Sequence, residues 1–275
     1  MSEEKEMSFL GHIGELRTHL IRSILAIIAG AIVVGFNIEW IMDQVFFGPT
    51  RNDFLTFRVV NHFSRMLIGH DSIHLPAFKI QQNLMFQQFN VMMAVSIFGG
   101  MVIAFPYIIW EFWKFISPAL HEKERKNSIF VINGVWFLFI LGILCGYYLI
   151  LPFAVNFAMI FKISHIIIPL YSLSDYTTVF LQVVLGMGVI FLFPMIVYLL
   201  TSIGILTPTF LKTYRRHAIV VIMVVAAIIT PADVLSMMAA ATPLVFLYEM
   251  SIWVSVFVAR KVAKEEQKAL AKTNS

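Results

Sequence analysis

Six apolar stretches dominate this sequence, and most are long enough to cross a hydrocarbon core about 30 Å thick. Only 13% of the 275 residues are charged, whereas soluble proteins carry roughly 25%. Because no soluble fold could bury so much apolar surface, we expect an all-α integral membrane protein with six transmembrane helices. The predicted spans are residues 20–40, 89–113, 129–151, 176–200, 217–230 and 234–258, all within one membrane domain of residues 1–260 that precedes a basic tail of residues 261–275.

Local signals in the first half refine this outline. Phe9, Ile13, Leu16 and Leu20 recur at helical spacing, which predicts an amphipathic helix lying on the membrane before the first span. Within the long loop 41–88, residues 54–67 are apolar enough for a short surface helix. Gly99-Gly100 and Pro106 are predicted kink sites in the second span.

In the second half, Pro152 is expected to end the third span, with an irregular apolar loop over residues 153–175. Pro194 is expected to interrupt the fourth span. The fifth stretch has only some fourteen residues, so it must tilt, snorkel or thin the bilayer. The Lys-rich tail from Arg260 is expected to be frayed.

The basic residues predict the orientation. Six spans place both ends on one side, and fifteen of the 20 Lys and Arg residues fall on that side. Basic residues mark cytoplasmic segments, so both termini are predicted to be cytoplasmic. The N-terminal residues are acidic and no cleavage-site pattern follows the first apolar run, so we expect no removable signal peptide.

The connection between the second and third spans is a dense mixed-charge hairpin over residues 110–126. Glu122 and Glu124 lie in it, and Glu15 lies on the N-terminal amphipathic helix at the same side of the membrane. Carboxylates favour guanidinium ligands, because the planar fork is held by two parallel charge-assisted hydrogen bonds. These residues indicate recognition of an arginine-bearing peptide, although Lys123 and Arg125 leave open a solvated, neutralised rim.

Few polar side chains interrupt the spans. Glu249 lies within the sixth span, where a structural role and a partner-binding role are equally open. Glu111, near the end of the second span, is interpreted as a helix-end residue that reaches water. Gln182 is the main polar residue of the fourth span and is suited to bonding across a helix interface. Asp233 follows Pro231 and is expected to cap the sixth helix.

The motifs of catalysis and cofactor binding are missing from the sequence. There is no nucleophile-elbow serine, no HExxH and no phosphate-cradling glycine loop, so we expect neither an enzyme nor a cofactor. The single cysteine, Cys145, excludes a disulfide framework. His62, His70 and His74 share the outer loop, but the turn residues among them make a metal site the minor interpretation.

The order of residues resembles the TatC family, the polytopic receptor subunit of the twin-arginine protein translocase. Three motifs carry the resemblance: His12-Ile-Gly-Glu15-Leu-Arg17, then Phe115-Ile-Ser-Pro118-Ala-Leu120 followed by Glu124-Arg125, then Thr230-Pro231-Ala-Asp233-Val. The resemblance implies a concave, six-helix bundle in the bacterial inner membrane, without a catalytic centre. It also implies binding of twin-arginine signal peptides of folded cargo, assembly with single-span TatA-type and TatB-type subunits, and transport driven by the proton-motive force.

Residue roles also follow from the resemblance. Glu15 and Glu124 match the signal-peptide site of the family, and Arg17, Phe115 and Arg125 match neighbouring motif residues. The matched structural positions are Pro49, Pro118 and Asp233.

The sequence departs from the family in two places. Leu192 stands where many members carry a glutamate, and we hypothesise that Gln182 partly replaces it for partner docking. The loop 41–88 is also longer than usual.

Two other classes of function remain open on the residues alone. A secondary transporter or channel would use Glu249 as its coupling group, and it would show solute flux as the purified protein. A membrane scaffold would bind partner helices but not signal peptides.

Overall fold

The structure, a computed structural model, describes residues 9–70, 80–116, 128–162, 164, 170–231 and 233–273. Within these residues, five helical segments are long and apolar enough to cross a membrane: Gly14–Phe36, Gln87–Phe115, Val131–Ile160, Leu173–Ser202 and Val234–Lys264. They correspond to five of the six predicted spans, so the chain is a multi-pass, mostly helical membrane protein. The remaining predicted span corresponds to a helix of 15 residues, Arg215–Ile229.

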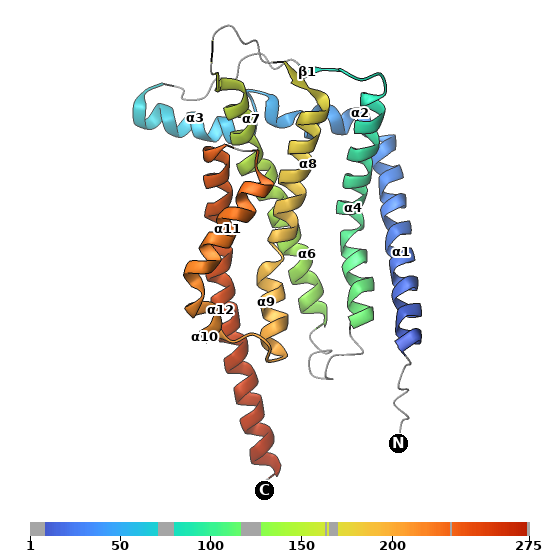
Figure 1. Cartoon of the computed structure of the whole chain (residues 1–275), viewed down its shortest axis with the longest axis vertical. Helices are drawn as coiled ribbons and strands as arrows, with labels where there is room; N and C mark the ends of the chain where they lie inside the picture. Colours follow the sequence, from blue (N-terminus) through green and yellow to red (C-terminus); the bar gives the residue numbers. More distant parts are fainter. Residues whose placement is uncertain are drawn as a thin grey trace. The chain divides into compact units, whose positions relative to one another are not determined.

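The chain divides into two compact units. The first unit, Met1–Gln44 with Leu84–Phe137, contains α1 (Phe9–Phe36), α2 (Ile38–Ile41), α4 (Gln87–Ile116) and the first part of α6 (Ser128–Cys145). Helices α1 and α4 lie side by side along most of their length (Figure 1). Their backbones meet at Gly100, where an added Cβ would stand 2.4 Å from the Ala31 nitrogen and 2.6 Å from the Ile27 oxygen. Only glycine fits this crossing.

This packing corrects one expectation for the first unit. Residues 9–20 are not a separate amphipathic helix, because α1 runs without a break from Phe9 to Phe36. Helix α4 runs from Gln87 to Ile116 through Gly99, Gly100 and Pro106, and the kinks expected at these residues stay a prediction. The two glycines allow α1 to approach, since a Cβ at Gly99 would lie 3.0 Å from Val34.

The second unit, Val45–Asn83 with Leu138–Ser275, holds the rest of the chain. A π-helical turn, η1 (Met42–Phe46), leads into it and is followed by the 3-10 turn η2 (Gly48–Thr50). Its helices and strands are α3 (Leu55–Ile68), β1 (Ile80–Gln81), the end of α6, η4 (Gly146–Ile150), α7 (Leu151–Ile160), β2 (Tyr171–Ser172), α8 (Leu173–Ile190), α9 (Phe193–Ser202), α10 (Pro208–Thr213), α11 (Arg215–Ile229) and α12 (Val234–Thr273). Strands β1 and β2 form one short parallel pair.

Small residues and aromatic rings hold this second unit together. A Cβ at Gly142 would stand 2.5 Å from the Met187 oxygen of α8, so α6 and α8 pack closely at this glycine. Phe46 is buried against Phe180 and Tyr176, and the Tyr176 hydroxyl donates to the Phe46 carbonyl over 2.6 Å. These contacts fix the segment after the first span against α8.

Proline positions in the second unit gave one correct and one wrong prediction. Pro194 begins α9 after a two-residue break at Phe191 and Leu192, as expected. Pro152 does not end the third span. It stands in the first turn of α7, a position where proline is tolerated because the N–H groups of a first turn have no partner within their own helix. Helix α7 therefore continues to Ile160. The predicted loop 153–175 is correspondingly shorter.

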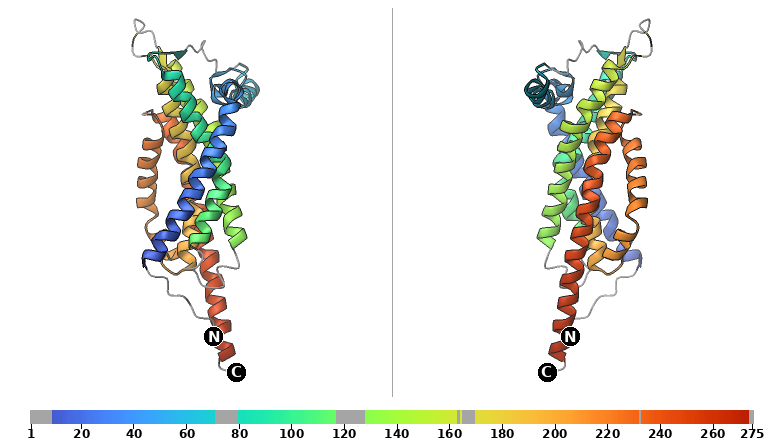
Figure 2. Two further views of the ribbon diagram at one scale, coloured as in Figure 1. Left: turned by 90° about the vertical axis from the view of Figure 1, so that its right-hand side faces the viewer. Right: turned by 90° about the vertical axis from the view of Figure 1, so that its left-hand side faces the viewer.

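Two further outcomes concern the ends of elements. The surface helix predicted at residues 54–67 is confirmed as α3, which runs crosswise to α7 and α8 (Figure 1). The expected frayed tail is wrong, because α12 continues as a helix to Thr273. Figure 2 shows the short α11 running beside α12, with which it packs.

Candidate functional site

A buried carboxylate joins α1 to α4 in the first unit. Glu111 is only 2% exposed. The His19 Nδ1 atom donates to its Oε2 atom over 2.5 Å, and the Lys114 Nζ atom lies 3.3 Å from its Oε1 atom. Arg22 stands farther away, with its Nη1 atom 3.9 Å from Oε2. Since an ionised carboxylate in an apolar helix is costly without partners, this cluster supplies the compensation that Glu111 requires.

Aromatic rings complete the same cluster. The His19 ring meets the Phe115 ring edge to face, with centroids 6.3 Å apart. The Lys114 ammonium stands 4.4 Å from the centre of the Trp110 ring, a cation–π distance. His19 on α1 is therefore held on two sides by α4, through Glu111 and Phe115, and the rotation of α1 at this end is fixed.

The residues assigned to signal-peptide binding are partly visible around this cluster. Glu15 and Arg17 are exposed on α1, and Glu15 precedes His19 by one helical turn. Phe115 is half-buried beside His19. The structure thus brings the turn that carries Glu15 to the end of α4 that carries Phe115. Pro118, Glu124 and Arg125 lie outside the described residues.

Glu111 is the residue that the sequence interpretation misjudged. A helix-end carboxylate reaching water was expected, and that expectation is wrong because α1 covers it. Part of the signal was present, since Lys114 follows at the i, i+3 spacing of a helical ion pair. The partner on α1 was not visible, because His19 is 92 residues away in sequence.

Glu249 has a partner within the chain. The Arg215 guanidinium, at the start of α11, holds it with both arms: Nε lies 2.9 Å from Oε1 and Nη2 lies 2.9 Å from Oε2. Next to it, the Tyr248 hydroxyl donates to the Leu211 carbonyl over 2.7 Å within a small apolar core. This arrangement ties the start of α11 to the middle of α12 and gives the carboxylate a structural role.

The other predicted structural residues also make contacts within the second unit. The Gln182 amide of α8 donates to the Ile228 carbonyl of α11. Asp233 caps α12 as predicted, because its Oδ2 atom accepts from the Ser236 N–H over 2.6 Å. Pro49 is fully buried in η2. Among the described residues, no group of three or more His, Cys, Asp or Glu side chains could hold a metal ion, and His74 lies outside them.

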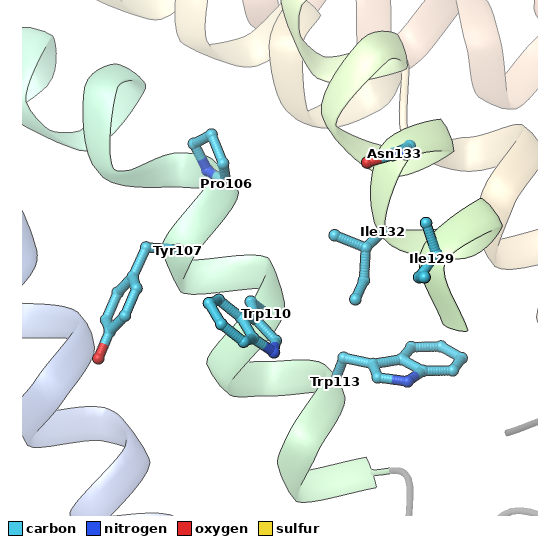
Figure 3. A pocket seen from close by; sticks show the side chains of 7 residues that line it. All are labelled: Pro106, Tyr107, Trp110, Trp113, Ile129, Ile132 and Asn133. Carbon is cyan, nitrogen blue, oxygen red and sulfur yellow. The ribbon is translucent and has the colours of Figure 1, made fainter.

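A groove lies beside the polar cluster, between α4 and the first turns of α6 (Figure 3). Its volume is about 570 Å³. Its walls are mostly apolar and aromatic, formed by Pro106, Tyr107, Trp110, Trp113, Ile129, Ile132 and Asn133. Asn133 is the one amide among these lining residues.

Comparison with known proteins agrees with this arrangement. A family model described as Sec-independent protein translocase protein (TatC) matches residues 11–243. The Sec-independent protein translocase protein TatC of Blattabacterium sp. subsp. Periplaneta americana (strain BPLAN) is 42% identical over 265 residues, covering 94% of this chain and 99% of that protein. The TatC of Halalkalibacterium halodurans is 34% identical and covers 96% and 95% of the two chains.

Solved structures show the same fold. A crystal structure of the Twin Arginine Translocase Receptor TatC in DDM has a TM-score of 0.71 and 28% identity, covering 89% of this chain and 99% of that one. A second crystal structure of that receptor has a TM-score of 0.67 and the same identity. Family, full-length relatives and fold all agree, and each describes a protein-transport component. This chain therefore belongs to the TatC family, and it is a multi-pass membrane component of the Sec-independent protein translocase.

Proposed function

We propose that this chain is the signal-peptide receptor of the twin-arginine translocase, with Glu15 and Glu124 binding the arginine pair of the cargo's signal peptide. The observation that supports this most is the placement of Glu15. It is exposed on α1, one turn from His19, which Glu111 and Phe115 of α4 hold in place. Two structures with the same fold are those of a twin-arginine translocase receptor.

The chemistry of this site suits arginine more than lysine. A guanidinium offers a planar fork of donors that two carboxylates can engage with several charge-assisted hydrogen bonds, whereas an ammonium is a compact point charge. Because Glu15 stands on a helix whose rotation is fixed, peptide binding loses little conformational entropy from the ordering of this helix. Arg17, Phe115 and Arg125 are proposed to frame the same site.

The membrane arrangement and partners form part of this proposal. We propose six spans, with α11 as the short fifth one and both termini in the cytoplasm of a bacterial inner membrane. At 1.5 Å per residue, the 15 residues of α11 extend about 22 Å, less than a hydrocarbon core of about 30 Å. Local thinning of the bilayer at α11 would favour the passage of folded cargo. We propose that this passage is driven by the proton-motive force and that it requires assembly with single-span TatA-type and TatB-type subunits.

Photocrosslinking tests the receptor proposal. A photoreactive residue placed beside Glu15 or Glu124 should label a signal peptide with an Arg-Arg pair and label a Lys-Lys peptide much less. Glu124→Ala or Glu15→Ala should remove this labelling. Glu39→Ala is a matched control, because Glu39 is an exposed carboxylate beyond the other end of α1. Equal labelling by both peptides, unaffected by Glu124→Ala, would refute the assignment, and solute-flux assays centred on Glu249 would follow.

A second prediction concerns Gln182. We propose that it also contributes to docking of a single-span partner, since Leu192, between α8 and α9, stands where the family resemblance implies a glutamate. Gln182→Leu should reduce crosslinking to that partner. It should also lower stability slightly, by about 0.6 kcal/mol, because the Ile228 carbonyl loses its donor. Thr178→Val, one turn away and also exposed, should leave the crosslinks unchanged. Undiminished crosslinks in Gln182→Leu would limit Gln182 to its contact with α11.

A further inference from the structure

The surface helix α3 presents three different faces. One face is buried against the second unit and carries Phe57, Asn61 and Ser64. A second face is exposed and basic, with Arg58, His62 and Arg65. The third face is exposed and apolar, and it consists of Leu55, Val59, Phe63, Met66 and Leu67. At 3.6 residues per turn these sets occupy three separate arcs of the helix. A continuous exposed apolar face of this kind marks a contact surface.

Aromatic contacts hold the start of α3 in place. The ring of Phe54, which directly precedes α3, meets the rings of Tyr147 and Tyr148 at centroid distances of 5.4 and 5.5 Å. The Thr56 hydroxyl donates to the Tyr148 carbonyl. The first turn of α3 is therefore attached to η4, in the helical segment that leads into α7.

These tyrosines also indicate the depth of α3 in the membrane. The Tyr147 and Tyr176 hydroxyls donate to the neighbouring carbonyls of Val45 and Phe46, over 2.8 and 2.6 Å, so both tyrosines stand at one level. Tyr176 lies in the first turn of the membrane-crossing segment Leu173–Ser202. Tyrosine side chains concentrate where lipid headgroups meet the hydrocarbon core. The start of α3 is thus at the edge of the hydrocarbon core.

The axis of α3 runs across the membrane-crossing helices of its unit. Figure 1 shows it crosswise to α7 and α8, and Figure 2, turned by 90°, shows it nearly end on while α12 stays upright. A helix that lies along the membrane surface buries its apolar face at the acyl boundary and keeps its basic face among the headgroups. The basic face of α3 favours lipid over a protein helix as the cover, because phosphate groups attract arginines beside an apolar contact.

We propose that α3 is an interfacial helix whose apolar face lies in the lipid leaflet and whose Arg58 and Arg65 bind phosphate groups of anionic glycerophospholipids. Arg58 already faces Asp53 over 3.7 Å, but both side chains are largely exposed. Since such a pair contributes little, a lipid phosphate can share the guanidinium. This role is separate from signal-peptide recognition, and it adds a second attachment of the chain to the membrane beside its spans.

Spin-label accessibility in vesicles tests the position of α3. Cys145→Ala removes the single cysteine, and Phe63→Cys, Met66→Cys or His62→Cys then gives full-length protein with one labelling site. In vesicles of phosphatidylcholine and phosphatidylglycerol, labels at positions 63 and 66 should collide more with lipid-soluble oxygen than with the water-soluble nickel complex NiEDDA. The label at position 62 should show the reverse. Trp253→Cys, at a position 78% exposed on α12, is the reference for a lipid-facing label.

Two results would overturn this placement. Greater accessibility to NiEDDA than to oxygen at positions 63 and 66 would put the apolar face in water. Low accessibility to both reagents at these positions would mean that a second copy of the chain covers the face, since the vesicles contain no other protein.

The arginines have a test of their own. A bimane fluorophore at position 62 is quenched by phosphatidylglycerol or phosphatidylcholine that is spin-labelled near the headgroup. We expect stronger quenching by phosphatidylglycerol, and Arg65→Gln should lower this preference about fivefold. Lys162→Gln is the matched control, because it removes one exposed positive charge from the same unit outside α3, and it should leave the preference unchanged. Equal quenching by the two lipids before any charge is removed would refute the binding of anionic lipid by α3.

Discussion

Gly100→Ala should destabilise the first unit by about 1–3 kcal/mol, the range found for over-packed interiors. The new Cβ would stand 2.4 Å from the Ala31 nitrogen and 2.6 Å from the Ile27 oxygen. Both are backbone atoms of α1, so no side chain can turn away to make room. The two helices must separate along the contact that holds this unit together. Denaturant unfolding in detergent, followed by circular dichroism, measures the change.

Gly35→Ala is the matched control for this prediction. Gly35 also faces α4, but its added Cβ would lie 3.7 Å from the Ser96 Oγ atom, an ordinary van der Waals distance. Since alanine is a better helix former than glycine by about 1 kcal/mol, Gly35→Ala should be neutral or stabilising. If Gly100→Ala and Gly35→Ala unfold alike, the close approach of α1 and α4 at Gly100 is incorrect.

Glu111→Leu should cost about 3–5 kcal/mol, the range for breaking a buried ion pair by removing one partner. It leaves the His19 Nδ1–H and the Lys114 ammonium without their acceptor at the end of the membrane span. Because the same contact fixes the rotation of α1, we also expect weaker selection of Arg-Arg over Lys-Lys peptides at Glu15. Unfolding in detergent measures the first effect, and the crosslinking assay measures the second.

Two variants separate these effects. Glu111→Gln preserves the shape and one acceptor oxygen, so it should lose less stability than Glu111→Leu. Asp53→Asn removes an exposed pair with Arg58, whose charged atoms are 3.7 Å apart and whose side chains are 68% and 67% exposed. Such a pair contributes at most about 1 kcal/mol. A Glu111→Leu protein as stable as Asp53→Asn would show that the buried cluster does not hold α1 to α4.

The apolar stretches predicted most of the helices correctly, because an apolar segment in lipid must satisfy its own backbone hydrogen bonds and therefore becomes helical. Local chemistry predicted several details as well. Asp233 caps α12, and Pro194 lies in the first turn of α9 after the expected interruption. In both cases the cause lies in one or a few neighbouring residues, namely a side-chain acceptor and a missing N–H.

The errors have a common cause in contacts between segments far apart in the chain. Pro152 was interpreted as a helix end, but proline is compatible with a first helical turn, and whether a helix starts there depends on the packing around α7. Residues 9–20 have an amphipathic pattern, and the polar part of it is used against α4 through His19. The frayed tail was inferred from lysine content alone, yet α12 continues to Thr273.

The sequence by itself therefore determined the membrane-helical class, the family and the carboxylates proposed to meet the signal peptide, because these depend on composition and on residue order. Only the tertiary structure decided that Glu111 is buried against His19 and that Arg215 holds Glu249. The physical reason is that the state of a polar group in a membrane depends on which partner comes within about 3 Å of it, and in the pairs of Glu111 and Glu249 that partner is on another helix.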